Sequence, residues 1–276
     1  MFPPTLAFAL ADPFHTADVP YFLSTTCIIL HFMLKYNITY MYAAGTAVSK
    51  GGIMTDIKAV IFDMDGVITD TEKLLVKYWC KAAGDMGYTM TREQALELRS
   101  LAARYAEPYL KEQFGEDFNY RKVRARRKEL MDDHIDLHGV GIKPGLTELI
   151  GYLNENGYKI AVATATDYDR AVPYLQKAGV YEKLDALCCG PSVEHGKPEP
   201  DIYLYAAQRL DVEPEECLAV EDSPNGVKAA YAANMCTVMI PDLTQPDQEL
   251  KKLIYRKCDD LMEIIGVLET FRQTFF

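Results

Sequence analysis

Short apolar runs alternate with helical patterns along most of the chain. The runs contain four or five residues and are rich in β-branched side chains, which predicts buried strands. They occupy residues 59–62, 159–163, 186–189, 217–220 and 237–240. Between them, apolar residues recur every three or four positions, as in amphipathic helices. Strands that alternate with helices predict a parallel, doubly wound sheet of the α/β class.

One long segment interrupts this alternation. Between about Asp70 and Gly139 nothing resembles a strand, and helical spacing recurs over 73–86, 91–98, 102–114 and 120–138. A segment of this length is large enough to form a small domain. We therefore predict a core domain made of residues 54–69 and 141–276, with an inserted all-helical cap domain at residues 70–140.

Residues 1–53 do not share the pattern. The apolar run from Val19 to Leu34 is shorter than the roughly 20 residues that a spanning helix needs, and acidic residues precede it where a signal peptide has basic ones. Residues 50–53, just before Met54, can be encoded by a purine-rich ribosome-binding sequence. We therefore hypothesise that residues 1–53 are a translated leader and that the native chain starts at Met54. A genuine disordered extension and a membrane anchor are the alternatives.

Composition narrows the class of protein. The 276 residues are 49 % hydrophobic and 25 % charged, an ordinary globular balance, and the formal net charge is −11. An acidic chain without a basic domain is poorly suited to nucleic acid. The seven cysteines are irregularly spaced and contain no C-x-x-C pair, which indicates reduced thiols. We expect a cytoplasmic monomer with neither nucleic acid nor membrane as a partner.

Polar side chains follow three of the predicted strands. Asp63 and Asp65 follow the first, Thr164 the second, and Glu221 and Asp222 the fourth. Because the carboxyl ends of parallel strands share one edge of the sheet, these side chains converge. Like-charge pairs at about 4 Å repel by on the order of 4 kcal/mol at an effective dielectric near 20, so four carboxylates need a cation. Hard oxygen ligands favour Mg²⁺.

Two further residues suit a phosphate. The hydroxyl of Thr164 can donate a hydrogen bond to it, and the ammonium of Lys197 can neutralise it as a point charge. Thr166 is an alternative for the phosphate-facing role, in which case Thr164 caps the next helix. Carboxylates, a cation and a phosphate together predict phosphoryl transfer, and a carboxylate such as Asp63 can serve as a covalent nucleophile.

Four segments together resemble the motifs of the haloacid dehalogenase superfamily. They are Asp63-Met64-Asp65-Gly66-Val67, Thr164 after its strand, residues 196–201 and residues 220–226. The resemblance extends from Met54 to about Asp242, and the helical insertion is similar to the C1 cap of β-phosphoglucomutase-like phosphatases. It implies a Rossmann-like core and a Mg²⁺-dependent phosphatase of small phosphorylated metabolites, such as sugar or polyol phosphates.

The resemblance also implies a role for each matching residue. Asp63 would be the nucleophile, and Asp65 would protonate the leaving oxygen and later deprotonate the hydrolytic water. Thr164 would donate a hydrogen bond to the phosphoryl group, and Lys197 would neutralise it. The implied Mg²⁺ ligands are Asp63, the backbone carbonyl of Asp65, Asp222 and Glu221, the last as a ligand or as a residue that orients the ligands.

Two alternative functions have distinguishing features. A sugar-phosphate mutase would have a histidine where this chain has Leu75, which favours hydrolysis. A non-catalytic, phosphate-binding regulatory protein is disfavoured because every catalytic position is filled.

The sequence indicates less clearly which residues of the cap face the substrate than which residues form the catalytic edge. Arg99, with Ser100 and Arg104, is a candidate for substrate binding, and the alternative is a solvated helix face. The basic run 121–128 is interpreted mainly as a solvated face, with steering of anionic substrates as the second interpretation.

Overall fold

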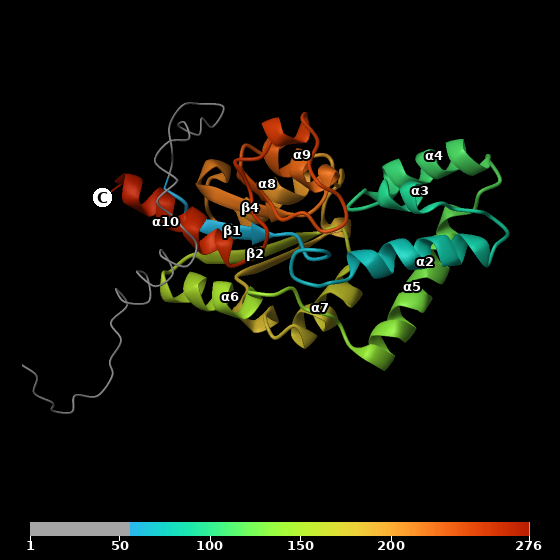
Figure 1. Cartoon of the computed structure of the whole chain (residues 1–276), viewed down its shortest axis with the longest axis horizontal. Helices are drawn as coiled ribbons and strands as arrows, with labels where there is room; N and C mark the ends of the chain where they lie inside the picture. The colour runs from blue at the N-terminus through green and yellow to red at the C-terminus, as the bar shows by residue number, and fades with distance from the viewer. Residues whose placement is uncertain (1–55, 276) are drawn as a thin grey trace, which may run out of the picture. The chain divides into compact units, whose positions relative to one another are not determined.

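The computed structural model describes residues 56–275, so the hypotheses on residues 1–53 lie outside the described range. A parallel sheet of six strands forms the centre of this part of the chain, in the order β3-β2-β1-β4-β5-β6 (Figure 1). The strands are β1 (Ala59–Phe62), β2 (Lys159–Thr164), β3 (Ala186–Cys189), β4 (Cys217–Glu221), β5 (Cys236–Met239) and β6 (Arg256–Lys257).

Helices cover both faces of the sheet. Side chains alternate along β1, so Val60 and Phe62 pack into one buried cluster, while Ala59 and Ile61 pack into the other. All four are fully buried, which explains why this strand is apolar at every position. The helices of the first cluster are α6 (Leu146–Glu155), α7 (Tyr168–Lys177) and α10 (Glu263–Phe275), and those of the second are α8 (Asp201–Leu210) and α9 (Pro224–Ala232).

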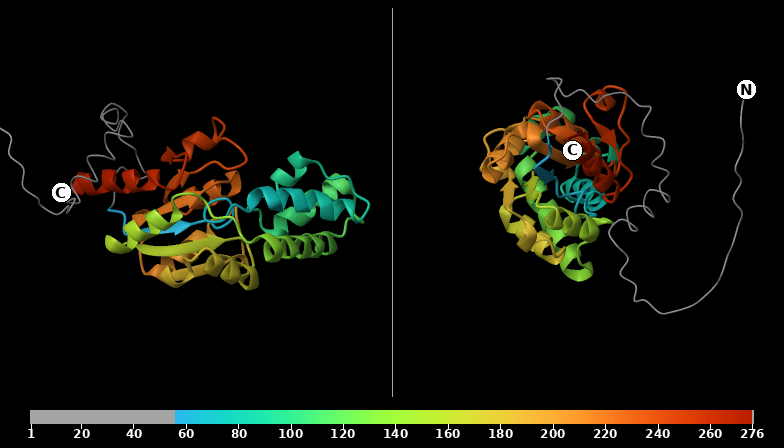
Figure 2. Two further views of the ribbon diagram at one scale, coloured as in Figure 1. Left: turned by 60° about the horizontal axis from the view of Figure 1, so that its bottom comes forward. Right: turned by 90° about the vertical axis from the view of Figure 1, so that its left-hand side faces the viewer.

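Four helices between β1 and α6 form a separate group, seen in cyan and green in Figures 1 and 2. They are α2 (Glu72–Gly84), α3 (Arg92–Leu96), α4 (Ala103–Phe114) and α5 (Tyr120–His138). Their apolar faces bury a cluster of their own, which includes Trp79, Leu110 and Val123. The predicted inserted helical cap therefore has its own hydrophobic core.

The chain leaves the sheet for these helices and returns at one place. The backbone N–H of Asp70 donates to the carbonyl of Gly141 at 2.8 Å, and Thr69 forms an antiparallel bridge with Ile142. This paired crossing lies at the predicted domain boundary. The boundaries themselves stay a prediction.

The register of the strands determines which side chains lie next to one another at the carboxyl edge of the sheet. Phe62 is level with Val162 of β2 and Val220 of β4, so Asp63 is flanked by Ala163 and Glu221. The N–H of Asp63 continues the ladder by donating to the carbonyl of Val220 at 2.9 Å. The edge therefore places carboxylates from two adjacent strands side by side.

The carboxyl-terminal elements β6 and α10 were not among the predicted elements. β6 is a two-residue, polar edge strand, which leaves no apolar pattern to read. In α10, however, Ile264, Val267, Leu268 and Phe271 are buried at helical spacing, a signal that was present in the sequence. Four short 3₁₀ helices complete the described chain: Tyr181–Lys183, Gly190–Ser192, Pro214–Glu216 and Leu250–Lys252. Within residues 56–275, no helix combines the length and apolarity needed to cross a membrane.

Candidate active site

Three buried carboxylates meet at the edge of the sheet. Ligand atoms of Asp63, Glu221 and Asp222 all lie within 4.8 Å of one another, and each side chain is almost inaccessible to solvent. Asp63 directly follows β1, Glu221 ends β4, and Asp222 is the next residue. The sheet thus brings together residues that are about 160 positions apart in the sequence, as the strand-end pattern predicted.

Lys197 joins two of these carboxylates. Its ammonium donates to Asp63 Oδ1 and to Glu221 Oε1, each at 2.5 Å, and to the carbonyl of Ala163 at 3.0 Å. Burial alone would lower the pKa of Lys197, but the charges of Asp63 and Glu221 outweigh burial and raise it. Lys197 therefore stays protonated where a phosphoryl group would need a cation.

Glu221 is saturated with hydrogen-bond donors. Besides Lys197, the hydroxyl of Tyr203 donates to Oε1 at 2.6 Å, while the N–H of Asp222 and the hydroxyl of Ser223 donate to Oε2 at 3.2 and 3.3 Å. A carboxylate accepts about four hydrogen bonds in all. Of the two roles left open for Glu221, this arrangement favours orientation of its neighbours over direct metal ligation.

The carboxylates of Asp63 and Asp222 fit a divalent cation. Asp222 Oδ1 is buried and has no hydrogen-bond partner within the described chain. Burial, with the charges of Glu221 and Asp63, raises the pKa of Asp222 well above its ordinary value. Burial likewise raises the pKa of Asp63 to about 8, with Lys197 opposing and Glu221 and Asp65 reinforcing the shift. A hard cation bound by these oxygens would compensate the charge that burial disfavours.

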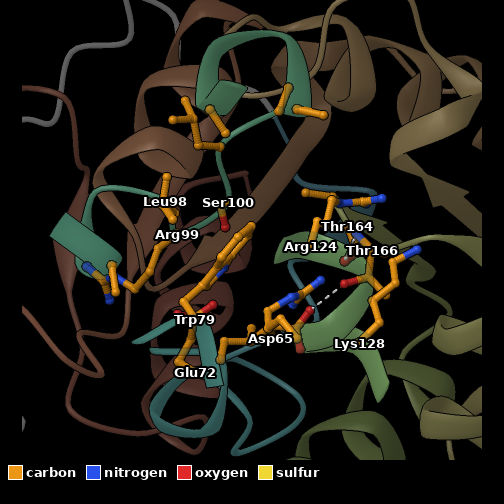
Figure 3. A pocket seen from close by; sticks show the side chains of 18 of the residues that line it. Asp65, Glu72, Trp79, Leu98, Arg99, Ser100, Arg124, Lys128, Thr164 and Thr166 are labelled. Carbon is orange, nitrogen blue, oxygen red and sulfur yellow. Dashed lines mark hydrogen bonds between the residues drawn. The ribbon is translucent and has the colours of Figure 1, made fainter. Parts of the chain in front are cut away.

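Asp65 is held apart from that cluster by two hydroxyls. The hydroxyl of Thr71 donates to Asp65 Oδ1. The hydroxyl of Thr166 donates to Oδ2 at 2.8 Å, the contact that Figure 3 marks with a dashed line. The side chain of Asp65 is not part of the three-carboxylate group. This leaves its backbone carbonyl as the atom for the predicted metal contact and its carboxyl free for proton transfer.

Thr164 and Thr166 are organised differently. The hydroxyl oxygen of Thr164 accepts a hydrogen bond from the N–H of Thr166 at 3.1 Å, so its own proton remains available to a ligand. Both residues line the cavity described below, but the hydroxyl of Thr166 is already directed at Asp65. This difference supports Thr164 as the phosphate-facing hydroxyl.

Two glycines make room for the carboxylates. Gly66 has φ +87°, and a Cβ there would lie 2.5 Å from Asp222 Oδ2. At Gly226, near the start of α9, a Cβ would lie 1.9 Å from the Glu221 carboxylate. Each position requires glycine because a charged side chain occupies the space that a Cβ would need.

Arg99 is not on a solvated helix face, so that alternative is wrong. It lies in the loop after α3 and is only 4 % exposed. One guanidinium nitrogen is 3.4 Å from Asp222 Oδ2, and another donates to the hydroxyl of Thr244. The loop itself is fixed because Asn225 donates to the carbonyl of Arg99 at 3.0 Å. Its contact with substrate stays a prediction.

The site opens into a cavity of about 90 Å³ between the helical insertion and the sheet edge. Asp63, Asp65 and Thr164 line its core side. Leu75 and Trp79 line it from α2. In Figure 3, Arg124 and Lys128 lie beside Thr164 and Thr166, and Trp79 and Glu72 lie on the other side of the view. Carboxylates of the sheet edge and cations of α5 thus line the same cavity.

The basic run on α5 is only partly solvated, which corrects the main interpretation of that segment. Arg127 is buried, while Arg124 and Lys128 are half-buried and line the cavity. The helix buries residues 120, 123, 127, 131 and 135, so Arg127 belongs to its inner stripe. A run of consecutive basic residues conceals this spacing.

Four residues of the site were missed by the motif argument. They are Thr71, Glu72, Tyr203 and Arg127, all of them buried. Glu72 is the first residue of α2, it lines the cavity, and its Oε2 has no partner within the described chain. Burial, with Asp222 and Asp65, raises the pKa of Glu72 well above its usual range. Only the density of polar residues after β1 could have indicated Thr71 and Glu72.

A profile of the haloacid dehalogenase-like hydrolases matches residues 57–234. The chain belongs to this family. The phosphorylated carbohydrates phosphatase of Thermotoga maritima is 31 % identical over 184 residues, which cover 65 % of this chain and 82 % of that protein. The Drosophila melanogaster protein named probable pseudouridine-5'-phosphatase is 30 % identical over 230 residues, covering 81 % and 95 %.

Solved structures agree with this assignment. The β-phosphoglucomutase of Clostridium difficile superimposes with a TM-score of 0.68 at 26 % identity, covering 79 % of this chain and 99 % of its own. The predicted family, the Rossmann-like core with a helical cap, and the phosphatase class of enzyme are confirmed by these matches.

Proposed function

We propose that this protein is a Mg²⁺-dependent phosphatase that hydrolyses small phosphorylated metabolites, such as sugar or polyol phosphates, through an aspartyl-phosphate. The observation that supports this most directly is the group of Asp63, Glu221, Asp222 and Lys197, buried at the carboxyl edge of the sheet beside an enclosed cavity. The phosphatase relatives point to the same reaction.

In the first step, a carboxylate oxygen of Asp63 attacks the phosphorus and the bond to the leaving oxygen breaks. Asp65 gives its proton to that oxygen, so the alcohol departs neutral. Lys197 neutralises the phosphoryl oxygens, and the hydroxyl of Thr164 donates a hydrogen bond to them. Mg²⁺ held by Asp63, the carbonyl of Asp65 and Asp222 would offset the remaining negative charge.

In the second step, water attacks the phosphorus of the aspartyl-phosphate. Asp65, now a carboxylate, takes a proton from that water, and phosphate leaves as the Asp63 carboxylate is regenerated. The hydrogen bonds from Thr71 and Thr166 keep both oxygens of Asp65 oriented in the cavity. Glu221 holds Lys197 in place through its buried ion pair.

Hydrolysis is preferred over the mutase reaction because Leu75 lines the cavity where mutases have a histidine. A leucine side chain offers no hydrogen bond with which to hold back water from the aspartyl-phosphate. The β-phosphoglucomutase neighbour keeps the mutase as the second candidate.

The decisive experiment compares Asp63→Asn with the unchanged enzyme on p-nitrophenyl phosphate and on a panel of sugar and polyol phosphates with Mg²⁺. We expect kcat to fall by roughly 10⁴-fold or more, as when other covalent nucleophiles are removed, with Tm retained. Asp70→Asn is the matched control, because Asp70 pairs with Lys73 outside the carboxylate cluster. Retention of activity in Asp63→Asn would exclude Asp63 as the nucleophile.

Interconversion of hexose 1- and 6-phosphates in the presence of glucose 1,6-bisphosphate, faster than phosphate release, would replace this proposal with the mutase. Binding of phosphate without turnover of any panel compound would instead support a regulatory protein.

A further inference from the structure

Helix α5 extends from the helical insertion to the side of α7 in the core (Figure 1). Its first half packs inside the insertion through Tyr120 and Val123, whereas Ile135, near its end, belongs to the buried cluster of α6 and α7. Within the described chain, Ile135 is the only α5 residue of that cluster. Helices in fixed positions are normally held by ridges of several side chains. One apolar contact therefore does not by itself fix how α5 lies over the core.

A stripe of charged residues on α5 lies beside this contact. It consists of residues 124, 128, 132 and 136, which are four positions apart and therefore share one side of the helix. The first two are basic and the last two are acidic. A second stripe, on the core, consists of residues 167, 170 and 177, whose spacing of three and seven positions also keeps them on one side of α7. Its charges are acidic, basic and basic, so the two stripes are complementary.

At one end of the stripes, Asp167 binds two cations. Nη2 of Arg124 lies 3.3 Å from Asp167 Oδ1, and the ammonium of Lys128 contacts Oδ2. Burial alone would raise the pKa of Asp167, but Lys128 and Arg124 outweigh burial and lower it, so Asp167 remains a carboxylate at neutral pH. All three residues are half-buried, and solvent screens such pairs less than fully exposed ones.

At the other end, α7 supplies the cations. Nε of Arg170 donates to Asp132 Oδ1 at 3.0 Å, and its Nη2 donates to the hydroxyl of Tyr174 at 2.8 Å. The ammonium of Lys177 lies 3.4 Å from Asp136 Oδ1. Exposed ion pairs contribute little one at a time, but several charges in one network act together. The pairs therefore matter as a set.

The order of the charges favours a single alignment of the two stripes. If α5 moved by one turn in one direction, Lys128 would face Arg170. If it moved by one turn in the other direction, Asp132 would face Asp167. Like charges at contact distance repel, so the pattern opposes both displacements as well as stabilising the alignment that is present.

We propose that these ion pairs form an electrostatic latch, which holds the helical insertion in one position over the cavity and loosens as ionic strength rises. Arg124, Lys128, Asp167 and Arg170 also line the cavity, so the latch is part of the cavity wall. When it loosens, the cavity becomes more accessible to solvent. The latch concerns the position of the insertion and can be tested independently of the proposed hydrolysis.

Trp79 provides the measurement. It is the single tryptophan of the chain, it lines the cavity from α2, and it is 7 % exposed. Acrylamide quenching of its fluorescence should increase at least about twofold between about 0.1 M and about 1 M NaCl, because the Debye length falls from about 10 Å to about 3 Å over that range. Equal quenching at the two salt concentrations would overturn the proposal.

A charge reversal on α5 tests the pairs themselves. Asp132→Lys places a cation beside Arg170, so the variant should show at about 0.1 M NaCl the quenching that the unchanged protein shows at about 1 M. Asp133→Lys is the matched control, because it makes the same change in charge at an exposed neighbouring position outside the stripe. Its quenching should equal that of the unchanged protein. If the two variants were quenched alike, the latch would be excluded.

A charge exchange distinguishes the latch from a general loss of stability. Asp136→Lys should increase the quenching, and adding Lys177→Glu should bring it back toward the value of the unchanged protein, because the pair is restored with its signs reversed. Lack of recovery in the double variant, with Tm lowered equally in both, would mean that residue 136 supports the fold instead of the latch.

The latch also has an effect on turnover. Opening lowers the fraction of protein that can bind substrate, so KM for p-nitrophenyl phosphate should be about threefold or more higher in Asp132→Lys than in Asp133→Lys. Equal KM values in the two variants would show that the ion pairs do not control access to the cavity.

Discussion

Tyr203 offers the sharpest test of how the buried network works. Its hydroxyl donates to Glu221 Oε1 at 2.6 Å, and both side chains are fully buried. Burial, with the charges of Glu221 and Asp63, raises the pKa of Tyr203 well above its ordinary value, so the hydroxyl keeps its proton at any working pH. Tyr203→Phe removes this donor and keeps the ring, over which Lys197 lies at 5.0 Å.

The expected cost follows from the kind of bond lost. A hydrogen bond to a charged group contributes about 1.5–3 kcal/mol to the free energy of unfolding. For a chain of this size, each kcal/mol lowers Tm by roughly 2–4 °C, so the variant should melt about 3–12 °C lower. Three donors remain on Glu221, namely Lys197, the Asp222 N–H and Ser223, so the protein should still fold.

The assay is urea and thermal unfolding of four proteins: the unchanged chain, Tyr203→Phe, Glu221→Gln and the double variant. A charge-assisted hydrogen bond is about twice as strong as a neutral one, so Tyr203→Phe should cost roughly half as much in the Glu221→Gln background. Tyr205→Phe is the matched control on the same helix. Its hydroxyl contacts Arg209 at an exposed site, and the change should stay within about 0.5 kcal/mol. An equal, small effect of Tyr203→Phe in both backgrounds would refute the idea that Glu221 is a buried, charged acceptor.

Four further outcomes are expected. Gly226→Ala should destabilise the fold by about 1–3 kcal/mol or more in urea titrations and lower activity, because its Cβ would overlap the Glu221 carboxylate. The control, Gly151→Ala, lies in open space on α6 and should be neutral or stabilising. Equal effects of the two changes would contradict the steric argument. Removal of divalent metal with EDTA should abolish turnover and lower the Tm measured by calorimetry, and Mg²⁺ should restore both. In Asp222→Asn, Mg²⁺ should no longer raise Tm. A Tm of the unchanged protein that is insensitive to Mg²⁺ would count against the metal site. Thr71→Val should lower kcat for alkyl phosphates more than for p-nitrophenyl phosphate, because the substitution misorients Asp65, the proton donor to the leaving oxygen. The decrease should be smaller than the roughly 100-fold or more expected when Asp65 itself is removed. An equal decrease for all substrates would argue against this role. Arg99→Met should weaken Asp222 positioning and raise the Mg²⁺ concentration needed for half-maximal activity, and an unchanged requirement would separate Arg99 from the metal site.

The strand-end carboxylates could be placed from the sequence because parallel strands impose a common edge. Once β1, β2 and β4 are recognised as buried parallel strands, Asp63, Thr164 and Glu221 must lie at the same end. Lys197 lies in the polar loop that follows β3 and was expected at the site from its charge and from the family resemblance. Helix bounds were also close, as with α5, whose apolar spacing agrees with Tyr120–His138.

By itself, the sequence determined the set of residues that periodicity and strand order bring to one edge of the sheet, namely Asp63, Asp65, Thr164, Glu221 and Asp222. Only the tertiary structure decided which oxygens of these residues are free. Glu221 is saturated because Tyr203, from a helix on one face of the sheet, reaches it, and Asp222 Oδ1 stays unpaired. Only the structure, likewise, could distinguish the buried Arg127 from the exposed basic residues beside it. Hydrogen-bond saturation and burial depend on side chains that pack together from distant elements, and spacing along one chain carries no record of those contacts.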